Sequence, residues 1–172
     1  MIVAFDLGGV LVDVDEARVR SLEVLFVGDS HDRFATGHLD VEGWLAVGDR
    51  DLLHQAWSDV VGWSAGGLEL LRETSTRAPC LVWSNTDPIH WAALGPATAG
   101  FVDDVALSFR LGFAKPDPRF FARALGGRDP ASVLFLDDRV ENVAGAVAAG
   151  VDAVLCRGVA EARAILRDRG VL

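Results

Sequence analysis

The N-terminal segment IVAFDLGGV (residues 2–10) opens with a four-residue apolar run, Ile2–Phe5, that ends abruptly at Asp6. Continuous apolar runs, in which polar residues do not alternate, are typical of strands that are covered on both faces of a parallel sheet. Four later runs have the same character, the last of them more weakly: Val133–Leu136, Cys80–Trp83, Ala153–Cys156 and Val105–Phe109. The sequence therefore predicts a parallel sheet of about five strands.

Segments with helical spacing lie between these strands. They are Gly67–Arg72, Pro118–Leu125, Val140–Ala149 and Val159–Arg169. Strands that alternate with helices predict the α/β class and, more narrowly, a doubly wound (Rossmann-like) sheet.

The connection between the first strand and Cys80–Trp83 is much longer than the later crossovers. Helical patterns at Glu16–Leu25 and Asp51–Val60, without a convincing strand, predict a small helical cap over residues 14–65. Residues 1–13 and 66–172 would then form the α/β core. Three tryptophans of the insertion are expected to form a small core of its own, unless some of them face a substrate: Trp44, Trp57 and Trp63.

The composition excludes several classes of protein. The chain has 172 residues, of which 51% are hydrophobic and 24% charged, and its net charge is −9. An acidic surface argues against binding of nucleic acid or of an anionic membrane, and the longest uncharged stretch, Pro88–Val102, is too short and too polar for a membrane span. Cys80 and Cys156 have no metal-binding spacing and are expected as buried thiols. Together with the lack of a signal-peptide pattern, they predict a cytoplasmic protein, which we expect to be a monomer or a homodimer.

Polar side chains gather where the predicted strands end. Three of the strands are followed by Asp6, by Ser84 and by the pair Asp137-Asp138, and the weaker strand Val105–Phe109 is followed by Lys115. Ligands of open α/β sheets bind at the carboxyl ends of the strands, so these residues predict a site. Because clustered carboxylates repel one another unless a hard cation neutralises them, the site is expected to bind Mg²⁺.

Four fragments that span the whole chain in order resemble the motifs of the haloacid dehalogenase (HAD)-like hydrolases. They are Phe5-Asp6-Leu7-Gly8-Gly9-Val10, Trp83-Ser84-Asn85-Thr86-Asp87, Lys115-Pro116-Asp117-Pro118 with Phe121, and Phe135-Leu136-Asp137-Asp138 with Asn142-Val143 and Ala149-Gly150. The insertion resembles a helical cap, although it is somewhat short. The Asp-Leu-Gly start of the first fragment is similar to a branch of sugar-phosphate phosphatases.

The resemblance implies a phosphatase that acts on a small phosphorylated metabolite, with a sugar phosphate as one candidate. Asp6 would attack phosphorus to form an aspartyl-phosphate, which water then hydrolyses. Mg²⁺ would be held by Asp6, by Asp138, by the main-chain carbonyl of Gly8, and through water by Asp137. Ser84, the backbone N–H groups around Asn85 and the charge of Lys115 would bind the transferring phosphoryl group.

One position departs from the family pattern. Phosphatases of this kind carry a second aspartate two residues after the nucleophile, where this chain has Gly8, which cannot transfer a proton. A glycosyl phosphate, with its better leaving group, would relax the need for an acid. Asp13 or Asp15 would be substitutes, and a protein that binds phosphate and Mg²⁺ without turnover is a further alternative.

A metal-independent 2-haloacid dehalogenase is the other enzymatic alternative. That branch carries an arginine in the cap, for which this chain offers Arg18, Arg20, Arg33 and Arg50, but the acidic pair favours a metal. His90 is expected to orient the loop after Ser84-Asn85. Three residues are expected to line the cleft between cap and core: Glu42, Trp44 and Asp49.

Overall fold

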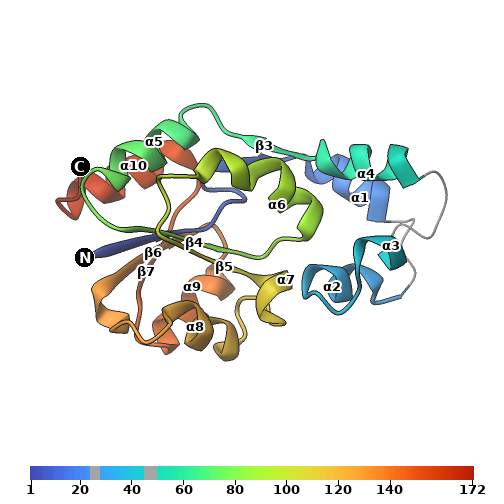
Figure 1. The fold of residues 1–172 in the computed structure, drawn as a ribbon. Helices are drawn as coiled ribbons and strands as arrows, with labels where there is room; N and C mark the ends of the chain where they lie inside the picture. Colours follow the sequence, from blue (N-terminus) through green and yellow to red (C-terminus); the bar gives the residue numbers. More distant parts are fainter. Residues whose placement is uncertain (24–27, 45–49) are drawn as a thin grey trace.

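A computed structural model describes residues 1–23, 28–44 and 50–172, and its main sheet has five parallel strands in the order β5-β4-β1-β6-β7 (Figure 1). The strands are β1 (Ile2–Phe5), β4 (Cys80–Ser84), β5 (Asp104–Leu107), β6 (Val133–Asp137) and β7 (Asp152–Leu155). Helices and 3-10 turns connect them: α5 (Gly67–Ser75), α6 (Pro88–Leu94), η1 (Gly95–Thr98), α7 (Ser108–Leu111), α8 (Pro118–Leu125), η2 (Pro130–Ser132), α9 (Val140–Ala148) and α10 (Gly158–Asp168). The predicted doubly wound α/β class is confirmed.

The core lies on both faces of the sheet, because successive side chains of a strand point to opposite sides. Phe5 packs in one buried cluster with Leu71 of α5 and Leu166 of α10. Ala4 packs in the other cluster with Phe121 of α8. Figure 1 accordingly shows α5 and α10 on one side of the sheet and α8 and α9 on the other.

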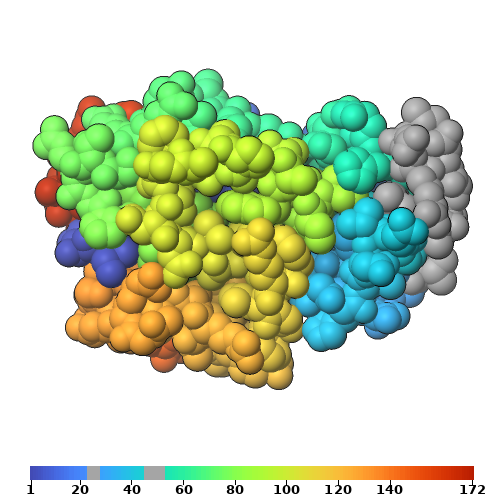
Figure 2. Space-filling view, in the orientation of Figure 1, coloured from blue at the N-terminus to red at the C-terminus, as the bar shows by residue number. Residues whose placement is uncertain are grey.

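The insertion forms a lobe beyond one end of the sheet, with α1 (Glu16–Glu23), α2 (Ser30–Ala35), α3 (Val41–Trp44) and α4 (Arg50–Ser58). Figure 2 shows this blue and cyan lobe against the yellow segment that includes α7. The prediction that the insertion contains no strand is wrong. Two short strands, β2 (Val12–Val14) and β3 (Val61–Trp63), pair antiparallel at the base of the cap. Each of these strands has three residues, and its partner is distant in the sequence, so neither has a recognisable local pattern.

The cap has a small aromatic core. Trp44 and Trp57 are buried there with Phe34 and Ile89, and the Phe34 and Trp44 rings are stacked with centroids 4.4 Å apart. Trp63 does not belong to it and packs against the α/β core, because β3 lies at the junction.

Both cysteines are buried and free, as expected, and burial raises the pKa of each thiol to about 12. No helix in the described part of the chain has the length and apolar character needed to cross a membrane.

The junction between cap and core contains a close backbone contact that gives a first prediction. A Cβ atom on Gly67, the first residue of α5, would collide with the carbonyl oxygen of Leu11, whereas a Cβ on Gly62 would meet open space. Gly67→Ala should lower the free energy of unfolding by about 1–3 kcal/mol, because a backbone neighbour cannot move aside cheaply. Urea unfolding measures this, and equal effects of Gly67→Ala and Gly62→Ala would contradict it.

Candidate active site

Strand pairing brings the predicted carboxylates together. Phe5 of β1 lies opposite Leu136 of β6, so Asp6 and Asp137 follow side by side at the carboxyl end of the sheet. Carboxylate oxygens of three residues lie within 4.8 Å of one another: Asp6, Asp137 and Asp138.

Lys115 is buried between two of these carboxylates. Its Nζ lies 3.1 Å from Asp6 Oδ1 and 2.6 Å from Asp137 Oδ2, and it donates to the carbonyl oxygen of Trp83 at 2.7 Å. Two of the three donors of this ammonium group therefore make hydrogen bonds within the protein, and its charge is also paired with Asp6. Lys115 therefore neutralises the carboxylates at the strand ends and also ties β4 to them.

The side chain of Asn85 holds the backbone of Lys115. Its Nδ2 donates to the Lys115 carbonyl oxygen at 2.9 Å, and its Oδ1 accepts from the Lys115 N–H at 2.8 Å. These two hydrogen bonds, which we call the Asn85 clamp, occupy both polar atoms of the Asn85 side chain. Ser84 is buried at the end of β4 and lines the larger of two neighbouring cavities.

Asp137 and Asp138 have different surroundings. Asp137 is fully buried and accepts hydrogen bonds from Asn142 Nδ2 and from the Arg139 N–H, in addition to Lys115. Asp138 lines the smaller cavity together with Asp6, and Asp137 does not. Asp137 therefore anchors Lys115, whereas Asp138 is placed to meet a ligand.

Burial and the neighbouring negative charge make Asp6 and Asp138 hard to ionise. Burial, with the charge of Asp137, raises the pKa of Asp6 to about 7, although Lys115 and the Leu7 N–H stabilise its ionised form. Burial and the charge of Asp137 also raise the pKa of Asp138.

These residues fit a magnesium ion. Three carboxylates face a single buried ammonium group, so the cluster has an excess of negative charge that a hard divalent cation would neutralise. The backbone passes close beneath Asp138, since a Cβ atom on Gly9 would collide with its carboxylate. Asp6, Gly8 and Asp138 line the same cavity of about 440 Å³, and they are the residues that could hold the ion.

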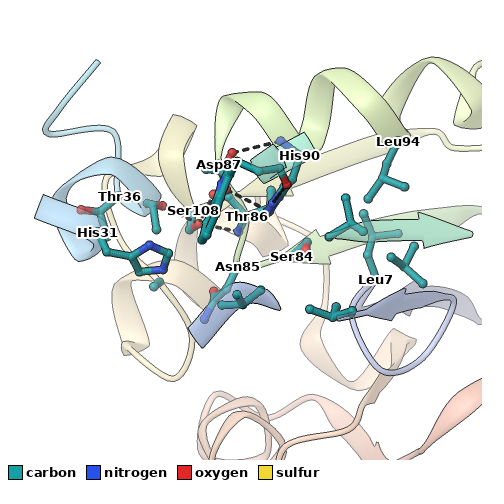
Figure 3. A pocket seen from close by; sticks show the side chains of 18 of the residues that line it. Leu7, His31, Thr36, Ser84, Asn85, Thr86, Asp87, His90, Leu94 and Ser108 are labelled. Carbon is teal, nitrogen blue, oxygen red and sulfur yellow. Dashed lines mark hydrogen bonds and ion pairs between the residues drawn. The ribbon is translucent and has the colours of Figure 1, made fainter. Parts of the chain in front are cut away.

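The smaller cavity continues into a larger one of about 510 Å³ between core and cap (Figure 3). Both are lined by Gly8, Val12, Val14, Asn85 and Arg139. The larger cavity is also lined by His31 and Thr36 of the cap and by Thr86, Asp87 and His90 of the core, as Figure 3 shows. The arrangement offers a charged end beside Asp6 and a roomier end under the cap.

The structure separates the other residues that the sequence singled out. Asp13 lines the smaller cavity with Asp6 and accepts a hydrogen bond from Ser64 Oγ at 2.6 Å, whereas Asp15 does not line it. Neither Glu42 nor Trp44 lines the cavities, contrary to expectation, and Trp44 is buried in the cap.

Three of the cap arginines do not line the two cavities either: Arg18, Arg20 and Arg33. Asp49 and the side chain of Arg50 lie outside the described residues. Sequence reasoning missed Arg139, although it directly follows the acidic pair. It also missed Ser108, for which the sequence carries no local signal.

The raised pKa of Asp6 predicts how stability depends on pH in the metal-free protein. The folded state binds a proton at Asp6 up to about pH 7, whereas the unfolded chain releases it near pH 4, so this residue lowers stability as pH rises from about 4 to 7. Asp6→Asn should therefore increase the free energy of unfolding at pH 8 by on the order of 2–4 kcal/mol, and much less at pH 5.

Urea unfolding in the presence of a chelator measures this, with Asp168→Asn on the exposed end of α10 as the control. A variant that is less stable than the wild type at pH 8 would show that Asp6 is not destabilising.

Comparisons with known proteins agree on the fold. No family model matches the chain. A predicted HAD-like family hydrolase from Porphyromonas gingivalis has a TM-score of 0.84 at 22% identity and covers 98% of each chain. A HAD family enzyme from Bacteroides thetaiotaomicron has a TM-score of 0.80 at 20% identity, over 90% of this chain and 92% of that one.

A second structure of the Bacteroides enzyme is of the wild-type protein in complex with magnesium and inorganic phosphate. It is similar to this chain with a TM-score of 0.75 at 21% identity, over 89% of this chain and 92% of that one. L-2-haloacid dehalogenase from Xanthobacter autotrophicus has a TM-score of 0.64 at 21% identity, over 90% of this chain and 77% of that one. The chain therefore has the fold of the HAD-like hydrolases.

Proposed function

We propose that this protein is a Mg²⁺-dependent phosphatase that hydrolyses a small phosphate monoester through an aspartyl-phosphate. The observation that carries the proposal is that Asp6 and Asp138 line the charged end of a cavity that continues under a cap, with the buried Lys115 paired to Asp6 behind them. A Bacteroides enzyme with the same fold has been found with magnesium and inorganic phosphate, which supports this choice. From the sequence we further propose a cytoplasmic monomer or homodimer.

Asp6 is the nucleophile of this proposal. Its Oδ1 accepts from the Leu7 N–H at 2.7 Å and meets Lys115, so Oδ2 is the oxygen without a partner among the described residues. Oδ2 forms a bond to phosphorus as the ester P–O bond breaks, and the leaving oxygen takes up a proton. Water then attacks the phosphorus of the aspartyl-phosphate, which releases inorganic phosphate and restores the Asp6 carboxylate.

Other groups of the chain would stabilise the charge that develops on the phosphoryl oxygens. Ser84 and the main-chain N–H of Asn85 donate hydrogen bonds to them, and Lys115 contributes its positive charge next to Asp6. Magnesium, held by Asp6, Asp138 and the carbonyl oxygen of Gly8, with Asp137 contributing only through water, would screen the repulsion between the nucleophile and the phosphate.

The cavity under the cap would receive the leaving group. Its lining includes the polar side chains of Asp32 and Thr36 from the cap and the apolar side chains of Val14 and Leu94. Arg139 is the one arginine or lysine in the lining of this cavity, and it already forms an ion pair with Glu141. A hydroxylated, uncharged leaving group such as a sugar suits these walls better than a second anionic group.

The activity is tested with p-nitrophenyl phosphate, with and without Mg²⁺. Asp6→Asn should reduce kcat by about 10⁴-fold or more, because no other group can form the covalent intermediate. Activity that is retained in Asp6→Asn would contradict the aspartyl-phosphate mechanism. Binding of Mg²⁺ without turnover of this ester or of a panel of metabolites would indicate a binding protein instead.

Metal-independent release of halide from a 2-haloacid would identify a dehalogenase. The cap arginines Arg18, Arg20 and Arg33 do not line the cavities, so we expect no halide release.

Asp13 is the acid and base that we propose in place of Gly8. It lines the cavity of Asp6 from β2, at the base of the cap, whereas Asp15 accepts a hydrogen bond from the Arg18 N–H at the N-terminus of α1. A general acid contributes about 10²–10⁴-fold to the rate, and most for poor leaving groups.

Asp13→Asn should therefore reduce kcat for an alkyl phosphate by about 10²-fold or more and for p-nitrophenyl phosphate only slightly. Asp15→Asn is the matched control, since asparagine keeps the helix cap, and it should leave both rates unchanged. Equal losses for the two substrates would exclude proton transfer by Asp13.

A further inference from the structure

A buried polar link joins the cap to the core beside the larger cavity. His90 of α6 places Nδ1 at 2.9 Å from Asp87 Oδ2 and Nε2 at 3.0 Å from the main-chain carbonyl oxygen of Trp57 in the cap helix α4. Trp57 Nε1 also donates to Asp87 Oδ2 at 3.0 Å. Figure 3 shows Asp87 and His90 facing each other at one wall of the cavity.

Both partners of the His90 ring are acceptors. A carbonyl oxygen has no proton to give, and Asp87 accepts from every partner that it has: His90, Trp57 and the N–H of Ile89. Burial opposes ionisation of Asp87, but the hydrogen bonds and charge of His90 outweigh it and keep the pKa of Asp87 below its ordinary value. A neutral imidazole has only one N–H, so it can satisfy only one of its two neighbours.

We infer that His90 is held as an imidazolium that fastens the cap to the loop after β4, which makes it a positioning residue for the proposed reaction. The ring is stacked on the Trp57 indole with centroids 4.9 Å apart and planes at 15°, an arrangement that favours a cation over an aromatic face. Its side chain is 12% exposed, so water does not replace the two hydrogen bonds readily.

Among the side chains that the structure describes, few other charged groups surround the ring. From the cap, α2 presents His31 and Asp32 to the same cavity, and α4 carries the exposed His54. Neither β3 nor η1 has a titratable side chain, and Arg110 of α7 lies over the neighbouring Trp91 ring. Asp87 is thus the carboxylate that contacts the ring directly.

A second link joins the cap to the same loop without a titratable group. Ser108 Oγ lies 2.7 Å from the carbonyl oxygen of Ala35 in α2 and accepts from the Thr86 N–H at 2.9 Å. The two links converge on residues 84–87, which carry Ser84 and the Asn85 clamp. Loss of one proton from His90 removes one of the two hydrogen bonds of its ring and weakens the attachment of the cap to the core. The link through Ser108 has no titratable group and does not respond to pH.

The protonation state is tested directly by nitrogen-15 NMR of the histidine side chains in the full-length protein. The resonances of His90 are identified from their loss in His90→Phe. At pH 7 both ring nitrogens should carry a proton in the wild type, and only one in Asp87→Asn, which keeps the helix cap but removes the charge. A wild-type ring with a single proton at pH 7 would overturn the inference.

The positioning role rests on the proposed function and is tested by the pH dependence of KM and kcat for p-nitrophenyl phosphate. When the His90 imidazolium loses one ring proton and becomes neutral, KM of the wild type should rise about tenfold and kcat should stay nearly unchanged. A tenfold rise corresponds to the loss of one hydrogen bond to a charged group. His90→Phe, which keeps the stacking on Trp57, should have the higher KM at every pH and no such rise.

Ser108→Ala is the matched control, because it weakens the other link. It should raise KM and retain the pH-dependent step of the wild type. The same step in His90→Phe would exclude His90 as its source. A wild-type protein without turnover would contradict the proposed function, and the NMR measurement would still decide the state of His90.

Discussion

The ion pairs of Lys115 with Asp6 and Asp137 are the interaction on which the site depends. Its ammonium group has no exposure to solvent and joins the ends of β1, β4 and β6 through two carboxylates and the Trp83 carbonyl oxygen. Removing Lys115 would cost about 3–5 kcal/mol, because it would leave the buried carboxylates of Asp6 and Asp137 without their counter-charge. The same contacts place the proposed nucleophile, so the stability of the strand ends and the chemistry of the site are linked.

The cluster nevertheless has more negative charge than Lys115 can neutralise. Burial, together with this excess of negative charge, makes Asp6 and Asp138 hard to ionise. A site of this kind is costly to the free protein and becomes favourable when a cation and an anion of complementary charge bind. Active sites commonly trade stability for function in this way.

The loop after β4 connects the two halves of the molecule. Asn85 holds Lys115 on the core side, while Thr86 and Asp87 bind the cap through Ser108 and His90. In the proposed reaction, a movement of the cap would therefore be transmitted to the groups that bind the phosphoryl oxygens. Such coupling suits an enzyme that must admit a substrate and then exclude water around it.

The sequence by itself determined the α/β class, the strands of the main sheet and the cluster at their carboxyl ends. Buried parallel strands are continuous apolar runs, and Asp6 and Asp137 directly end two of them. Both are local properties, so they can be read without the fold.

Only the tertiary structure decided the pairing of β2 with β3, the presence of Asp13 rather than Asp15 in the cavity that Asp6 lines, and the link of His90 to Trp57. Each depends on contacts between residues far apart in the chain. Such contacts have no periodic pattern, because their geometry is set by how the cap packs on the core.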